Sequence, residues 1–507
     1  MSTIRRQSII SSGIVYFGFA LGFLNIFLFT REKGGFTMEQ YGLTVMFTAI
    51  ASIMYSFANL GTQAYIFKFH PYYNDNLPPK KNDMMSWALL VCGIGFLLVI
   101  AAGLIFKDFV IQKFGEHSAE LVKYYYWIFP FGFGLTFFSL LESYAWQQKK
   151  SILTNFLKEI QFRLLTLTLI LLTFTGLLTS FDAFIKIYSF TYILIALILL
   201  INLIGTGKLH FDFSPSRVTK KFLSKILSLA FLVWSGGLVF NVSQFFSVLV
   251  ISAVIHDGLA FAGIYGLALN IASLIQAPQR AVVSASMAPL SQAWKDKNYS
   301  KINRIYHRSS INQLIFSAGM FVLIWINFKD GVSTFHLRPA YLNAQNVFLF
   351  IGMWRIVDMG TGLNSQIIGT STFWRFDFFC GIILILLTLP LNYILAKKLG
   401  VTGPAIADLI TFSIFNGIRF LFLYRKFRMQ PFTAKSLYTL LLALAGYFVC
   451  HYLFSSQQGF LWILLRSTVF LGIYTSGVLL LKLSEDVLPV LATVKKRLGL
   501  AKKPVNQ

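Results

Sequence analysis

Charged residues are scarce in this chain of 507 residues, since Asp, Glu, Lys and Arg together make up 12% of it. An ordinary globular domain has roughly 25%. Cysteines are also few: Cys92, Cys380 and Cys450 are odd in number and show no ligand spacing. This pattern argues against a disulfide framework and against a metal site, so we expect the three cysteines to be packing residues.

Motifs of nucleotide and metal chemistry are also missing from the sequence. There is no Gly-rich Walker loop, no dinucleotide fingerprint and no His-Glu-x-x-His, and none of the seven histidines has metal-ligand spacing with another. The sequence therefore predicts no cofactor, no metal and no catalytic residues. Any energy-driven step would depend on an ion gradient or on the membrane potential.

Long apolar stretches are what the chain has in abundance, with 56% hydrophobic residues overall. About fourteen stretches between residues 9 and 483 are long enough to cross a bilayer. Among them are residues 164–179, 259–289 and 346–369. The first stretch is too long, and too well followed by others, to be a cleaved signal peptide. We therefore expect an all-α polytopic membrane protein of about fourteen transmembrane helices.

The net charge of +25 is distributed unevenly over the loops. Lysines and arginines concentrate in alternate loops, those around Lys80, Ser216, Lys297 and Lys426, and in the tail at residues 495–503. The positive-inside rule then places both termini in the cytoplasm. The charge is explained by topology and predicts no nucleic-acid partner, although the tail could also bind anionic lipid headgroups.

A polar, basic stretch at residues 205–225 is the strongest internal boundary. It predicts an N-terminal six-helix lobe (residues 1–210), a C-terminal six-helix lobe (211–428), and an extra helix pair with a basic cytoplasmic tail (429–507). A faint repeat supports two lobes, because Tyr-Gly-Leu occurs at residues 41–43 and again at 265–267, each near the start of the second span of its half. Repeated bundles are common in transporters.

Several motifs resemble those of one known family. They are residues 39–43 (Glu-Gln-Tyr-Gly-Leu), 58–61 (Ala-Asn-Leu-Gly), 262–268 (Ala-Gly-Ile-Tyr-Gly-Leu-Ala) leading to Pro278 and Pro289, and 400–407 (Gly-Val-Thr-Gly-Pro-Ala-Ile-Ala). The chain thereby resembles the polysaccharide-transporter branch of the multidrug/oligosaccharidyl-lipid/polysaccharide (MOP) exporters, whose Wzx-like members flip lipid-linked oligosaccharides. The resemblance covers most of residues 9–427 and implies two six-helix lobes, alternating access and a hydrophilic central cavity.

Ionisable residues inside apolar spans are costly, so each is a functional candidate. Arg280 has no acidic residue within a helical turn, and a guanidinium suits a phosphate because it forms bidentate hydrogen bonds. The alternative for Arg280 is snorkelling to the interface. Arg355 and Asp358 are three residues apart and could pair, or Asp358 could bind a coupling proton or Na⁺. Asp408 is a second candidate for ion coupling.

Three further charges lie close to predicted span ends. Glu142 and Arg419 are expected to snorkel, and Arg466 is expected to contact lipid or the helix pair. Neutral amides form a larger group that could bind sugar hydroxyls, or could instead form interhelical hydrogen bonds. These amides are Asn25, Asn59, Gln63, Asn241, Gln244, Asn270, Gln276, Asn364 and Gln366.

Three functions remain open at the level of sequence. The resemblance favours a flippase that moves a polyprenyl-pyrophosphate-linked oligosaccharide across the bacterial inner membrane for O-antigen, capsule or exopolysaccharide assembly. The first alternative is a MATE-like, cation-coupled antiporter of small molecules. A polytopic glycosyltransferase or ligase is disfavoured, because the longest external loops, residues 107–123 and 328–345, are short.

Overall fold

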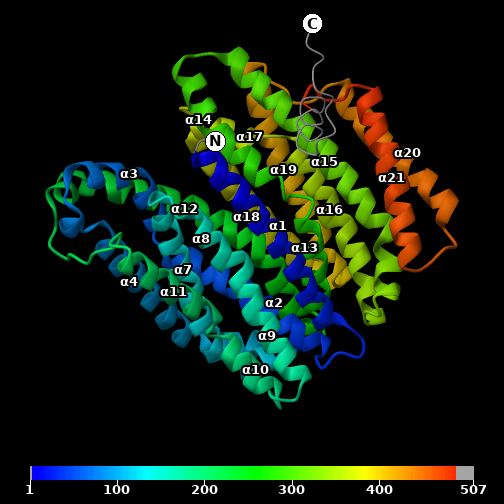
Figure 1. The fold of residues 1–507 in the computed structure, drawn as a ribbon, viewed down its shortest axis with the longest axis horizontal. Coiled ribbons are helices and arrows are strands. Elements are labelled where there is room, and N and C mark those ends of the chain that lie inside the picture. The colour runs from blue at the N-terminus through cyan, green and yellow to red at the C-terminus, as the bar shows by residue number, and fades with distance from the viewer. Residues whose placement is uncertain (1–2, 487–507) are drawn as a thin grey trace, which may run out of the picture. The chain divides into compact units, whose positions relative to one another are not determined.

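The computed structural model describes residues 3–486, with side chains from residue 13 onward except at positions 281, 284, 288 and 374. The basic tail at residues 495–503 lies outside this range. Helices dominate, and no β-strand is assigned between residues 3 and 486 (Figure 1). In this part of the chain, eleven helices are long and apolar enough to cross a membrane. The expected all-α polytopic membrane fold is therefore confirmed.

Three of the expected spans differ from a single α-helix. Residues 151–174 form one continuous run of α8, the π-helix η3 and α9, so this element begins well before residue 164. Residues 259–289 are divided by a turn at 274–278, and residues 346–369 by a turn at 361–363. Irregular backbone at membrane depth is tolerated only where protein or a water-filled cavity surrounds it.

The chain divides into two compact units. The first comprises residues up to Gly266 together with Thr388–Pro404, and the second comprises Leu267–Leu387 and the residues from Ala405 onward. The first contains α1 (Thr3–Thr30), α2 (Met38–Ala58), α3 (Thr62–Asn76), η1 (Pro79–Lys81), α4 (Met84–Ile105), α5 (Lys107–Phe114), α6 (Ala119–Lys123), η2 (Tyr125–Trp127), α7 (Ile128–Gln147), α8 (Ser151–Asn155), η3 (Phe156–Gln161), α9 (Phe162–Phe174), α10 (Phe181–Tyr188), α11 (Thr191–Gly205), α12 (Arg217–Val254) and the first half of α13 (Gly258–Ser273).

The second unit contains the rest of α13 and most of the later helices. These are α14 (Gln279–Lys295), α15 (Tyr299–Thr334), η4 (Pro339–Asn343), α16 (Ala344–Gly360), α17 (Asn364–Thr370), the first half of α18 (Trp374–Leu399), α19 (Thr402–Phe427), α20 (Ala434–Phe454) and α21 (Phe460–Leu480). The division into two six-helix lobes and an extra pair stays a prediction.

The repeated Tyr-Gly-Leu motif has a packing role in the first unit. A Cβ atom on Gly42 of α2 would lie 1.7 Å from the carbonyl oxygen of Leu259 in α13, and a Cβ on Gly266 would lie 2.5 Å from a methyl of Val45. Only glycine permits this approach, as in other close helix pairs of membrane proteins. The two copies of the motif thus pack α2 and α13 against each other.

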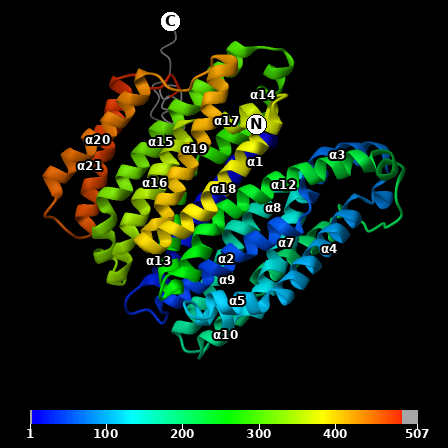
Figure 2. The ribbon, with the colours of Figure 1, turned by 180° about the vertical axis from the view of Figure 1, so that it is seen from behind.

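The helix pair α20–α21 packs on α15 in the second unit (Figures 1 and 2). Arg466 of α21 is buried at the contact, where it donates to the carbonyl oxygens of Ile326 (2.8 Å) and Gln457 (3.0 Å). Its guanidinium also lies 3.5 Å from the buried carboxylate of Asp330. Of the two roles expected for Arg466, the structure shows the helix-pair contact.

Candidate functional site

Three of the expected cavity amides of the first unit make internal hydrogen bonds. Asn25 of α1 is buried and donates to the carbonyl oxygen of Arg163 (2.9 Å). Asn59 caps the end of α2, where its Oδ1 accepts from the backbone N–H of Gly61 (2.8 Å). Gln63 donates to the hydroxyl of Ser143 (2.9 Å). The first bond joins α1 to α9, the second closes the turn between α2 and α3, and the third joins α3 to α7. Each of these amides thus has a structural role.

Asn241 and Gln244 are half-buried on α12. They remain predicted cavity residues.

Two ion pairs around the π-helix η3 form a charged cluster in the first unit. Arg163 lies 2.7 Å from Glu159, and Lys158 lies 3.0 Å from Glu142. Both glutamates are buried, so the expectation that Glu142 snorkels is wrong. π-Helical bulges occur often at functional sites. The sequence signal for this cluster was the spacing of four residues between Glu159 and Arg163. It was missed because the span was expected to begin at residue 164.

Asp358 of α16 is the centre of a polar cluster in the second unit, which we call the Asp358 cluster. One oxygen of its carboxylate accepts from the side-chain amide of Gln279 in α14 (2.9 Å). The other accepts from that of Asn416 in α19 (3.2 Å). The Oδ1 atom of Asn416 accepts in turn from Asn364 (2.9 Å) and Thr361 (3.2 Å). The cluster thus joins α14, α16, α17 and α19.

Arg355, the expected partner of Asp358, lies on the same helix. Its guanidinium is 3.7 Å from the centre of the Trp354 ring, a cation–π arrangement. Asp408 is buried on α19, about two helical turns before Asn416. Sequence reasoning therefore identified Asp358 and Asn364, but it missed Gln279 and Asn416, which complete the cluster.

A largely buried ion pair between α18 and α19 lies close to the Asp358 cluster. Arg419 of α19 is 2.7 Å from Asp377 of α18, which also accepts from the hydroxyl of Ser365 (3.3 Å). Only 6% of Arg419 is exposed, and its guanidinium stacks 3.7 Å from the Phe415 ring. The expectation that Arg419 snorkels is therefore wrong. Removing one member of such a buried pair is costly, because the other charge is left unpaired.

Arg280 lies in the first turn of α14, directly after the turn at residues 274–278. Its side chain is exposed. Asn270, also exposed, and Gln276, half-buried, lie on the other side of this interruption or within it. The N-terminus of a helix has unpaired backbone N–H groups and a positive dipole end, so it attracts anions. Arg280 adds a full positive charge at the same point.

Comparison with solved structures shows that the chain shares its fold with polytopic helical membrane proteins. A structure titled lipid II flippase MurJ, inward closed conformation, matches with a TM-score of 0.70 at 19% identity and covers 92% of this chain and 98% of its own. An inward-facing multidrug resistance MATE family transporter of the MOP superfamily matches with a TM-score of 0.63 at 14% identity, covering 82% and 96%. A MATE in the straight conformation has a TM-score of 0.53 at 16% identity, covering 83% and 94%.

The family follows from the sequence comparison. Residues 4–294 match the model of the family described as polysaccharide biosynthesis protein, which is more than half of the chain. The protein therefore belongs to this family, and the resemblance to the polysaccharide branch of the MOP exporters is confirmed. A comparison with curated protein sequences gave no match.

Proposed function

We propose that the protein is a flippase of the bacterial inner membrane. Its substrate would be a polyprenyl-pyrophosphate-linked oligosaccharide used for O-antigen, capsule or exopolysaccharide assembly, and both termini would be cytoplasmic. The family and the fold support a lipid-linked flippase or exporter. The flippase among the matched structures acts, by its title, on lipid II. The finer substrate assignment rests on the residues described next.

The observation that carries the proposal is the position of Arg280. An exposed guanidinium in the first turn of an interrupted helix combines a fixed charge with a positive dipole end. Within the described residues, no acidic side chain forms an ion pair with it. A diphosphate fits such a site, since its oxygens accept bidentate bonds from a guanidinium. Asn270 and Gln276 beside the interruption would then contact sugar hydroxyls.

The Asp358 cluster offers a means of coupling transport to an ion. Gln279, which donates to Asp358, is the residue before Arg280. A proton or Na⁺ bound at Asp358 would compete for the carboxylate oxygen that Gln279 now uses. Loss of this bond would release the N-terminus of α14 and thereby move Arg280. The coupling is reciprocal, so an anion at Arg280 would alter the affinity of Asp358 for the cation.

The alternative function is a MATE-like cation-coupled antiporter, which the matched MATE structures favour by fold alone. It also uses Asp358 but has no need of Arg280. A glycosyltransferase or ligase would need catalytic groups, and the short loops between the helices offer little space for them.

Glycan export in a deletion strain that expresses variants of Arg280 distinguishes these functions. We expect Arg280→Ala to abolish export at matched protein abundance. Arg280→Lys should restore only part of it, because a lysine keeps the charge without the bidentate geometry. The control is Lys295→Gln, which removes an exposed cation from the last turn of the same helix. Full export by Arg280→Ala would remove the main support for an anionic lipid substrate.

A further inference from the structure

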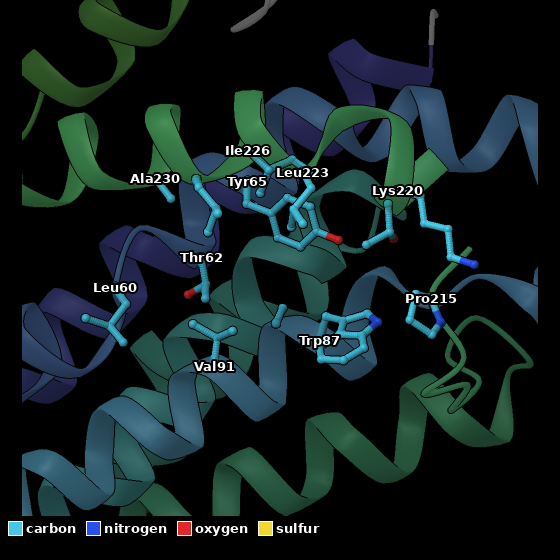
Figure 3. Close-up of a pocket in the computed structure, with 13 residues that line it drawn as sticks. Leu60, Thr62, Tyr65, Trp87, Val91, Pro215, Lys220, Leu223, Ile226 and Ala230 are labelled. Atoms are coloured by element: carbon cyan, nitrogen blue, oxygen red, sulfur yellow. The ribbon is translucent and has the colours of Figure 1, made fainter. Parts of the chain in front are cut away.

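An apolar pocket of about 320 Å³ lies within the first unit, between α3, α4 and α12 (Figure 3). The interruption between α2 and α3 forms one wall through Leu60, which has a φ of +42°. Gly61 follows with a φ of +78°, and a Cβ there would lie 2.2 Å from the carbonyl oxygen of Ala230 in α12. The absence of a side chain at residue 61 therefore lets α12 approach the interruption between α2 and α3. The pocket lies next to this close contact.

Two nitrogen-bearing side chains of the pocket lie at one end of it. Figure 3 shows the indole nitrogen of Trp87 and the ammonium of Lys220 on the same side, near Pro215. The Trp87 Nε1 atom is buried and has no hydrogen-bond partner in the part of the chain that the structure describes. An unpaired buried donor costs free energy, so it is a natural site for an acceptor from outside the protein. Lys220 is exposed and supplies a positive charge.

Hydrogen bonds hold this end of the pocket together. The buried carboxylate of Asp83, just before α4, accepts from the backbone N–H of Ser216 (2.9 Å) and from the hydroxyl of Thr219 (2.6 Å), both at the start of α12. The hydroxyl of Tyr73 lies 2.7 Å from that of Thr219. The starts of α4 and α12 are thus fixed beside each other, and Lys220 follows directly after Thr219.

The helix that carries this end of the pocket is long enough to extend beyond the hydrocarbon core of a bilayer. α12 has 38 residues and is roughly 57 Å long, so it exceeds a hydrocarbon core of about 30 Å. Its first turns carry Lys220, Lys221 and Lys225, which are exposed. Leu223, between these lysines, and Leu227, just after them, line the pocket and are 50% and 61% exposed. A basic end followed by exposed apolar residues is typical of a helix at a membrane interface.

We propose that this pocket binds an anionic membrane phospholipid, with one acyl chain among the apolar residues and the phosphate on Lys220 and the Trp87 N–H. Charge complementarity selects the anionic headgroup, since basic residues near the interface attract such lipids. A volume at the low end of ligand pockets holds a segment of one chain rather than a long polyprenyl carrier. The site is separate from Arg280 and does not depend on the function proposed above.

Quenching of Trp87 fluorescence by brominated acyl chains tests the proposal. The detergent-solubilised protein is titrated with brominated phosphatidylglycerol or brominated phosphatidylcholine, and the signal of Trp87 is the difference between the parent protein and Trp87→Phe. We expect saturable quenching by phosphatidylglycerol and much weaker quenching by phosphatidylcholine. Lys220→Gln should weaken the apparent affinity for phosphatidylglycerol about fivefold. Ala230→Phe should block the pocket and abolish the quenching.

Lys225→Gln is the matched control, because it removes an exposed lysine from the same helix that does not line the pocket. Its apparent affinity should stay within about twofold of the parent, by screening of an exposed charge. Equal quenching by both lipids, no saturable quenching, or equal effects of Lys220→Gln and Lys225→Gln would each overturn the proposal. Lys220 and Lys225 are both exposed, so neither substitution should prevent folding. Comparing Lys220→Gln with Lys225→Gln therefore tests the proposed lipid site even if Ala230→Phe does not fold.

Discussion

Asp358 is a carboxylate whose described partners are amide donors from two other helices. If it binds the coupling ion, Asp358→Asn should abolish the dependence of transport on pH or Na⁺, because the amide cannot be protonated or bind a cation by charge. Membrane abundance should stay near normal, since an asparagine keeps the shape and one acceptor. The measurement is transport rate against imposed ion gradients in proteoliposomes. Unchanged dependence of transport on the gradient would exclude Asp358 from ion coupling. The control is Asp296→Asn, because Asp296 is an exposed carboxylate directly after α14.

Arg466 shows how a single charge fixes two elements together. Replacing it with methionine leaves Asp330 buried without its cation, so we expect a loss of about 3–5 kcal/mol in stability. Thermal unfolding in detergent measures this loss. The double variant Asp330→Asn with Arg466→Met should recover part of it, because no unpaired charge then remains. An unchanged melting temperature for Arg466→Met would show that the contacts of Arg466 with α15 do not stabilise the packing of α21 on α15.

At the level of elements, α1 packs closely against the π-helical segment. A Cβ on Gly18 would lie 2.6 Å from the carbonyl oxygen of Glu159, a backbone atom, whereas a Cβ on Gly13 meets nothing within 4 Å. Gly18→Ala should therefore destabilise by about 1–3 kcal/mol. Gly13→Ala on the same helix should be neutral or slightly stabilising, since alanine favours a helix. Equal melting temperatures for the two variants would show that α1 does not pack in this way.

The elements also show how far sequence reasoning extends. Apolar stretches predicted the helical membrane fold, because hydropathy reports burial in lipid directly. Hydropathy could not predict the π-helix at Phe156–Gln161, since one extra residue in a turn leaves composition unchanged. Snorkelling was the wrong expectation for Arg419 because its partner Asp377 lies on a different helix, and a single sequence carries no record of that contact. Gln279 and Asn416 were missed for the same reason.

For the whole molecule, the distribution of charge predicts cytoplasmic termini and a cytoplasmic loop before α12. The native cysteines Cys92, Cys380 and Cys450 are all buried, so background labelling should be low. A cysteine at Ser214, which is exposed, should resist a membrane-impermeant thiol reagent in intact spheroplasts, whereas one at Lys33 should react. Labelling of the Ser214 variant before permeabilisation would show that the loop before α12 is outside the cytoplasm, opposite to the predicted orientation.

The proposed function requires the protein to move a lipid-linked, pyrophosphate-bearing glycan between leaflets. Leaflet transfer of a fluorescent polyprenyl-pyrophosphate oligosaccharide can be measured in proteoliposomes by its protection from an impermeant quencher. We expect transfer by the parent protein well above the rate in protein-free liposomes. Arg280→Ala should return transfer close to the protein-free rate, and Lys295→Gln should leave transfer at the rate of the parent protein. Transfer by the parent protein no faster than in protein-free liposomes would show that the protein is not a flippase for this class of lipid.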